Sequence, residues 1–280
     1  MKWIKRLVLA AIATVAVPAG IGYRTFRQAP EFYRRYDWDD QKRGQINQQA
    51  ADKLLSARQL AQQSHFEGVR ARRAGQTLPT TQTEPARLIL SEEELNALLL
   101  HNADAAPSLR HRMEQYVRSP GIYLREGRII LAAEVPRLST VMSVQFVPAL
   151  GDRGLLRLSI DGTQAGRLPV PRAVVEIQLR HLRGMIEARL PQLRSDARID
   201  SFGAVNGSAA AAAMSMLLLD LISDRSADAV IYMPVDEKGT SVPLRITGLS
   251  IVEDQLTLDV LPVLDAAERS RLFDRIRESP

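Results

Sequence analysis

The stretch 88-LILSEEELNALLL-100 marks a point where a strand-like apolar run gives way to a helix. Ser91 and Glu94 have the S-x-x-E spacing of a capping box, in which the serine hydroxyl accepts from the Glu94 amide and the glutamate reaches back to the Ser91 amide. The apolar residues that follow fall on one helical face: Leu95, Leu98 and Leu99. Asn96 lies next to that face, where an amide usually needs a partner. The stretch therefore predicts the entrance to a folded domain.

The sequence after this helix has the pattern of β-hairpins. Residues 121–135 (GIYLREGRIILAAEV) and 141–162 (VMSVQFVPALGDRGLLRLSIDG) each hold two apolar runs around a glycine-containing turn. Residues 248–260 (GLSIVEDQLTLDV) repeat the first pattern, with Gly121 matching Gly248. This match indicates either an internal duplication or two similar hairpins in one sheet.

Two helices are expected among these strands. Pro171 suits the first position of a helix. The apolar residues of that helix share one face: Val175, Leu179, Leu182, Ile186 and Leu190. Residues 207–222 (GSAAAAAMSMLLLDLI) carry no charge before Asp220, which favours a buried core helix over a cavity-lining or membrane-dipping one. The predicted fold is α+β, a curved antiparallel sheet packed on two or three helices, with a main domain over 87–265 and a tail or short helix over 266–280.

The amino-terminal segment, residues 1–24, predicts membrane attachment. Basic residues open it, and residues 7–23 are then uncharged, close to the minimum of about 17 residues that spans a bilayer. A retained anchor is favoured over a signal peptide cleaved after Ala19. Because arginines also follow the uncharged run, the distribution of charge allows both orientations of the segment in the membrane. We favour the orientation that places the domain in the periplasm over the one that places it in the cytoplasm. The aromatic residues expected at the membrane interface are Trp3, Tyr23, Phe26, Phe32 and Tyr33.

Residues 37–75 are polar and helix-favouring, with sparse apolar positions, and predict a juxtamembrane stalk helix that packs along a narrow stripe. Residues 76–86 are rich in threonine and proline and predict a linker. A stalk of this kind could also dock a partner protein of the cell envelope.

Composition and motifs give little support to catalysis. The 280-residue chain has no cysteine, which excludes disulfides, cysteine zinc sites and thiol chemistry. No serine-hydrolase elbow, zinc-protease motif, P-loop or dinucleotide fingerprint is present. Aromatic residues make up only 5% of the chain, too few for base-stacking platforms, although the net charge is +5. We therefore expect no catalytic residue, no cofactor, no metal and no nucleic-acid partner.

Three features together resemble a family: the amino-terminal anchor, the helix entry ILSEEELNALL, and the β-rich region that runs into GRLPVP and a helix. They resemble the YpmS-like group of membrane-anchored bacterial proteins and, more distantly, the tubular lipid-binding (TULIP) superfamily. The resemblance covers about residues 88–190. It implies a helix wrapped by a strongly curved sheet, an apolar groove for lipid, and a role for Asn96 in tying the helix to neighbouring backbone. It transfers no catalytic residue.

These observations lead to one main functional expectation. The domain binds or transfers a lipid or another apolar envelope molecule in a groove without catalysing a reaction. The predicted lining is Leu95, Leu98, Leu99, Leu179, Leu182, Ile186, Leu217 and Leu218. The alternative is a tethered scaffold that docks through the stalk helix, and an envelope hydrolase comes third because it needs a polar cluster that the sequence does not display.

Overall fold

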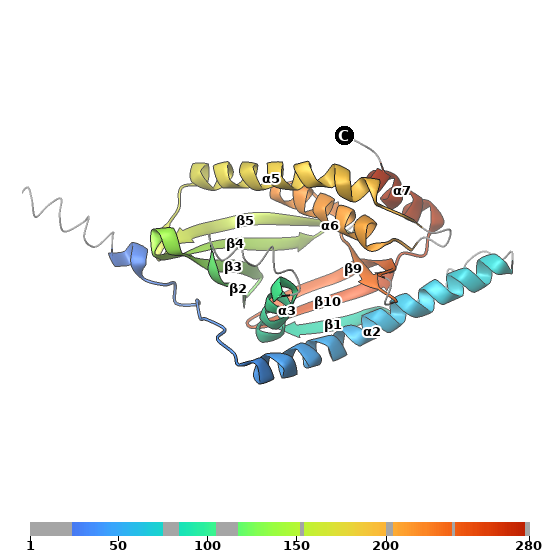
Figure 1. Ribbon diagram of the computed structural model, residues 1–280, viewed down its shortest axis with the longest axis horizontal. Coiled ribbons are helices and arrows are strands. Elements are labelled where there is room, and N and C mark those ends of the chain that lie inside the picture. Colours follow the sequence, from blue (N-terminus) through green and yellow to red (C-terminus); the bar gives the residue numbers. More distant parts are fainter. Residues whose placement is uncertain are drawn as a thin grey trace, which may run out of the picture.

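The computed structural model describes residues 24–74, 84–104, 117–151, 154–199, 204–236 and 239–277. Its strands form two antiparallel sheets with helices around them (Figure 1). Sheet A has the strand order β1-β10-β9-β8, and sheet B has the order β2-β3-β4-β5-β6 with β7 paired to β5. The antiparallel α+β class is confirmed, but the strands make two sheets where one curved sheet was predicted.

The strands of sheet A are β1 (Ala86–Ser91), β8 (Val230–Pro234), β9 (Ser241–Val252) and β10 (Gln255–Pro262). Those of sheet B are β2 (Arg118–Arg125), β3 (Arg128–Val135), β4 (Thr140–Leu150), β5 (Leu155–Ala165), β6 (Leu168–Pro169) and β7 (Ala227–Asp228), with the 3-10 turn η1 (Pro136–Leu138) between β3 and β4. The helices are α2 (Asp40–Arg73), α3 (Glu92–Asp104), α5 (Arg172–Ser195), α6 (Gly207–Ile222) and α7 (Ala266–Arg277). The three hairpins expected from the sequence are therefore confirmed as β2–β3, β4–β5 and β9–β10.

Helix α2 has the predicted extent but does not stand apart from the domain. Ala57 and Ala61 are fully buried in the cluster that holds Leu88 of β1. Lys53 forms an ion pair of 2.7 Å with Glu94 of α3. The predicted packing along a narrow stripe is therefore present, and the small alanine side chains of that stripe allow the helix to approach the sheet closely.

The segment before α2, residues 24–39, lies across one face of sheet B, and we call it the strap. Phe32, Tyr33 and Tyr36 pack around Tyr123 of β2. The Tyr123 hydroxyl donates to the carbonyl of Arg34 at 2.5 Å, and burial raises the pKa of Tyr123 to about 12. Phe32 and Tyr33 were expected at a membrane interface, but these rings instead cover the sheet.

The predicted anchor at residues 7–23 lies outside the described residues, as do Trp3 and Tyr23. Among the helices in the described part of the chain, none combines the length and apolar character needed to cross a membrane.

The β2–β3 and β9–β10 hairpins meet turn to turn and join the two sheets. The Gly127 amide donates to the Ile251 carbonyl at 3.0 Å, and the Asp254 amide donates to the Leu124 carbonyl at 3.3 Å. Leu124 and Ile251 are the positions that the repeat matches, and Gly127 and Asp254 follow them at the same spacing. The two contacts are thus related by a local two-fold symmetry.

The registers of these two hairpins also coincide. Ile122 lies opposite Leu131 in the first, and the matching residues Leu249 and Leu258 lie opposite each other in the second. The repeated pattern therefore marks two hairpins of one geometry in different sheets, which corrects the expectation that similar hairpins would share a sheet.

Candidate functional site

The amino-terminal end of α3 lies where the two sheets meet. The capping box is present, because the Ser91 amide donates to Glu94 Oε2 at 2.7 Å and the Glu94 amide donates to Ser91 Oγ at 3.2 Å. The Asn96 side chain is fully buried and pairs with both backbone groups of Ile122, accepting at 2.8 Å and donating at 2.6 Å. Asn96 therefore ties the helix to the edge of β2, as expected, and covers groups that an edge strand would leave unpaired.

Glu92, at the start of α3, is a buried carboxylate with every oxygen engaged. Its Oε2 accepts from the Leu124 amide at 2.7 Å and from Arg125 at 3.2 Å. Its Oε1 accepts from Arg34 of the strap at 2.8 Å and from the Tyr36 hydroxyl. This carboxylate links α3, β2 and the strap, so its role is structural. A buried charge is tolerated when it is ion-paired and hydrogen-bonded, as Glu92 is.

The face of sheet B opposite the strap is apolar, and we call it the open face. Residues paired across antiparallel strands point to the same side of a sheet, and the pairings place these residues together: Ile129, Leu131, Ala133, Met142, Val144, Phe146 and Ile160. Leu131 and Ile160 remain 44% and 38% exposed. An apolar face of this kind favours contact with hydrocarbon, at about 0.8 kcal/mol for each methylene buried.

Helices α5 and α6 border the open face. At one end, Leu217 of α6 packs into the cluster that contains Leu156 and Leu158 of β5. At the other end, β6 pairs with the last residues of β5 and leads directly into α5. Because α5 also packs on α6 through Ile186 and Leu190, it extends along β5 (Figure 1). Further exposed apolar residues lie on these helices: Val174, Ile177, Met185 and Leu218.

The residues predicted to line a groove, as far as the structure describes their side chains, lie on separate surfaces. Leu95, Leu98 and Leu99 are half-buried on α3, which packs on α2, β1 and β2. Leu179 is half-buried on α5, Ile186 packs between α5 and α6, and Leu217 joins the main core. Leu218 is 47% exposed, whereas the side chain of Leu182 lies outside the described part of the structure. Sequence reasoning missed the open face, although the alternation in residues 129–146 pointed to it.

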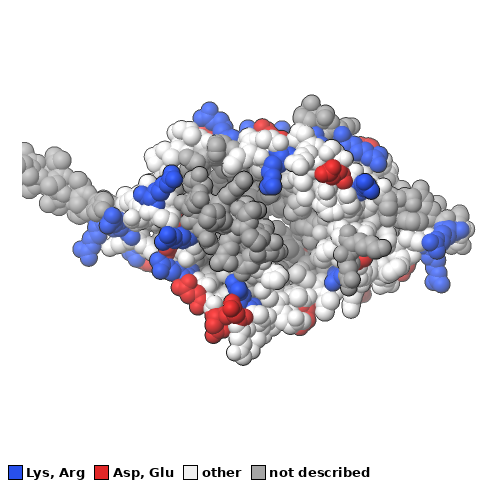
Figure 2. Space-filling model, viewed as in Figure 1, with Lys and Arg blue, Asp and Glu red and all other residues white. Residues whose placement is uncertain are grey.

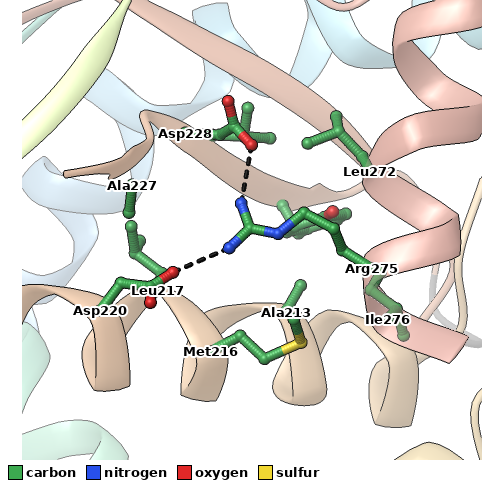
Figure 3. A pocket seen from close by; sticks show the side chains of 11 residues that line it. Ala213, Met216, Leu217, Asp220, Ala227, Asp228, Leu272, Arg275 and Ile276 are labelled. Carbon is green, nitrogen blue, oxygen red and sulfur yellow. Dashed lines mark hydrogen bonds and ion pairs between the residues drawn. The ribbon is translucent and has the colours of Figure 1, made fainter. Parts of the chain in front are cut away.

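A small hollow lies between α6 and α7. Figure 3 shows Arg275 of α7 reaching Asp228 at 2.9 Å and Asp220 of α6 at 2.8 Å, beside Met216 and Leu272. Its volume of about 40 Å³ lies well below the range of small-molecule sites, about 300–1,000 Å³. The arginine and its two carboxylates fasten α7 to the domain.

Comparison of the chain with protein-family models, with curated proteins and with solved structures gives no match. The resemblance to YpmS-like and TULIP proteins therefore stays a prediction.

Proposed function

We propose that this chain is a membrane-anchored envelope protein that binds or transfers a lipid or another apolar ligand without catalysing a reaction. The supporting observation is the open face, where an apolar side of sheet B keeps Leu131 and Ile160 partly exposed. Sheets usually bury an apolar face against another layer. An acyl chain on this face would complete that burial, and the predicted anchor at residues 7–23 would hold the domain beside a source of such chains.

Two of the least exposed carboxylates of the described residues, Glu92 and Asp220, are occupied in ion pairs. Glu92 is held by Arg34 and Arg125, and Asp220 is held by Arg225 and Arg275. In the described ranges, no group of three histidine, aspartate or glutamate side chains is arranged to hold a metal ion. These pairings favour a binding protein over a hydrolase. The extracytoplasmic location is part of the same proposal and depends on the orientation of the predicted anchor.

A tethered scaffold is the second candidate. Leu55 and Phe66 of α2 are exposed and lie on the same side of the helix, because eleven residues make about three turns. They could contact a partner protein. The alanine side of α2 is already used within the domain, so this surface is smaller than the sequence suggested.

Ile160→Asp is the variant that tests lipid binding, and Ile89→Asp is its control. Both isoleucines are strand residues with 38% of their surface exposed, but Ile89 pairs with Thr257 on the outer side of sheet A. The full chain is reconstituted in vesicles that contain a phospholipid with a photoreactive acyl chain, and crosslinked peptides are identified by mass spectrometry. We expect crosslinks on β3–β5, and about a tenfold or greater loss in Ile160→Asp, because an acyl chain would desolvate the new carboxylate.

Crosslinks on β3–β5 that persist in Ile160→Asp, or that fall equally in Ile89→Asp, would contradict the proposal. Thermal unfolding of both variants, measured alongside, separates loss of binding from loss of fold.

A further inference from the structure

Helix α5 carries an apolar stripe that stays exposed. Val174, Ile177 and Met185 are 46%, 55% and 51% exposed, and we call them the α5 stripe. They lie on one side of the helix, because three residues make nearly one turn and eleven make about three turns. Ile186 and Leu190 pack on α6 from another side of the helix. The stripe is therefore not needed to hold α5 in the domain.

Exposed arginines lie on both sides of the α5 stripe. Arg180 and Arg189 are exposed and fall roughly a quarter turn to either side of it. Neither side chain forms an ion pair or hydrogen bond with a described residue. The nearby Glu176 is already paired with Arg172 at 3.0 Å. Figure 2 shows basic side chains along the edge of the molecule where α5 lies in Figure 1. Positive charge beside the stripe is thus available to an anionic partner.

The start of α5 lies close to the point where the predicted anchor ends. The Arg167 amide donates to the Thr25 carbonyl at 3.1 Å. Helix α5 begins at Arg172, five residues later, so at most about 18 Å of chain separates it from this contact. An anchor that ends before residue 24 would therefore hold the amino-terminal end of α5 beside the bilayer surface.

We propose that α5 docks lengthwise on an anionic membrane surface, with the α5 stripe in the interfacial layer and Arg180 and Arg189 at lipid phosphates. The inference rests on the membrane anchor of the proposed function. Apolar residues on one side of a helix with basic residues beside them are typical of helices that lie in the membrane interface. Each arginine near an anionic bilayer contributes about fivefold to the docking equilibrium. Docking would bring the edge of sheet B that α5 borders next to the bilayer that supplies lipid.

A spin label on the α5 stripe tests this docking. The chain has no cysteine, so a single introduced cysteine reports on one position. Ile177→Cys is labelled with a nitroxide in the full chain and reconstituted in nanodiscs of phosphatidylcholine, with or without phosphatidylglycerol. We expect the label to be shielded from a water-soluble nickel complex and accessible to oxygen in the anionic nanodiscs. Leu55→Cys is the control, because Leu55 is 44% exposed on α2, and its label should stay accessible to the nickel complex in both lipids.

The two arginines are tested in the same labelled chain. Arg180→Gln combined with Arg189→Gln should lower the equilibrium constant for docking by about fivefold for each charge removed. Arg70→Gln combined with Arg73→Gln is the matched control. These two arginines are also exposed on a helix, α2, and their side chains form no ion pair with a described residue. We expect this control to leave the shielding unchanged.

A label at position 177 that remains equally accessible to the nickel complex in both lipids, or control arginines that matter as much, would overturn the docking of α5. Dipolar broadening between labels in detergent would overturn it by showing that a second copy covers the stripe. Shielding in both lipids that Ile160→Asp abolishes would overturn it by showing that the stripe covers the ligand.

The anchor, the docking of α5 and the open face give distinguishable failures. A chain that separates from the nanodiscs would contradict the anchor and this inference with it. A retained chain with a water-exposed label contradicts the docking alone and leaves acyl crosslinking on β3–β5 unchanged. Failure of the open face as a lipid site removes that crosslinking and leaves the shielding of the label in place.

Discussion

Replacing Glu92 by alanine is expected to lower the free energy of unfolding by about 2–4 kcal/mol, because it removes charge-assisted hydrogen bonds and leaves a buried amide without an acceptor. The change leaves the amide of Leu124 without its acceptor and takes the buried partner away from Arg34 and Arg125. It also removes the acceptor of the Tyr36 hydroxyl and so loosens the strap. Urea unfolding followed by circular dichroism measures the difference.

Glu93→Ala is the matched control. Glu93 is adjacent and shares the favourable interaction of a carboxylate with the amino-terminal end of α3, but its side chain is exposed. We expect a loss of about 0.3–1 kcal/mol for this variant. Equal losses in the two variants would show that Glu92 acts only through the helix end and would contradict its role as the junction of α3, β2 and the strap.

Gly166→Ala is expected to lower the free energy of unfolding by about 2–5 kcal/mol and to release the strap. Gly166 has a φ of 59°, and a Cβ there would lie 2.0 Å from the carbonyl oxygen of Phe26. The left-handed conformation costs about 1–2 kcal/mol for a residue with a Cβ, and the collision with backbone adds about 1–3 kcal/mol. Trypsin cleavage after Arg27 and Arg34, measured under native conditions, should accelerate as the strap detaches.

Gly127→Ala separates the cost of the left-handed conformation from the cost of the collision with Phe26. Gly127 has a similar φ of 66°, but a Cβ there would meet nothing within 4 Å. We expect only the conformational cost of about 1–2 kcal/mol and no change in cleavage of the strap. If Gly166→Ala behaved in the same way, the close contact between Gly166 and Phe26 would not hold the strap in place.

Local signals predicted much of this fold. The capping box at Ser91 and Glu94 and the hairpin turns depend on neighbours in sequence, and each has the predicted structure. Asn96 has the partner that a buried amide needs, although this partner is Ile122 on another element. The buried role of Glu92 was missed because the three glutamates of this turn look alike. One signal was present: Glu92 and Asn96 are four residues apart, so two polar groups share a helical face next to an apolar stretch.

Long-range pairings were harder to predict. Nothing in the local pattern tells that β1 pairs with β10, which closes sheet A separately from sheet B. The described residues of the predicted lining lie on separate surfaces for the same reason, since apolar faces of α3, α5 and α6 were assigned to one surface without knowledge of their neighbours. A packing stripe on α2 was predicted but its partner was not, because Ala57 and Ala61 carry no apolar signature that would assign them to the cluster around Leu88.

Native mass spectrometry of the full chain, released from nanodiscs of its host membrane, tests lipid binding most directly. We predict that one lipid remains bound to the wild-type chain and to Ile89→Asp and is lost from Ile160→Asp. Organic extraction then identifies it. A bare protein mass, unchanged after incubation with added membrane lipid, or a lipid retained equally by all three proteins, would contradict a ligand on the open face and favour the tethered scaffold.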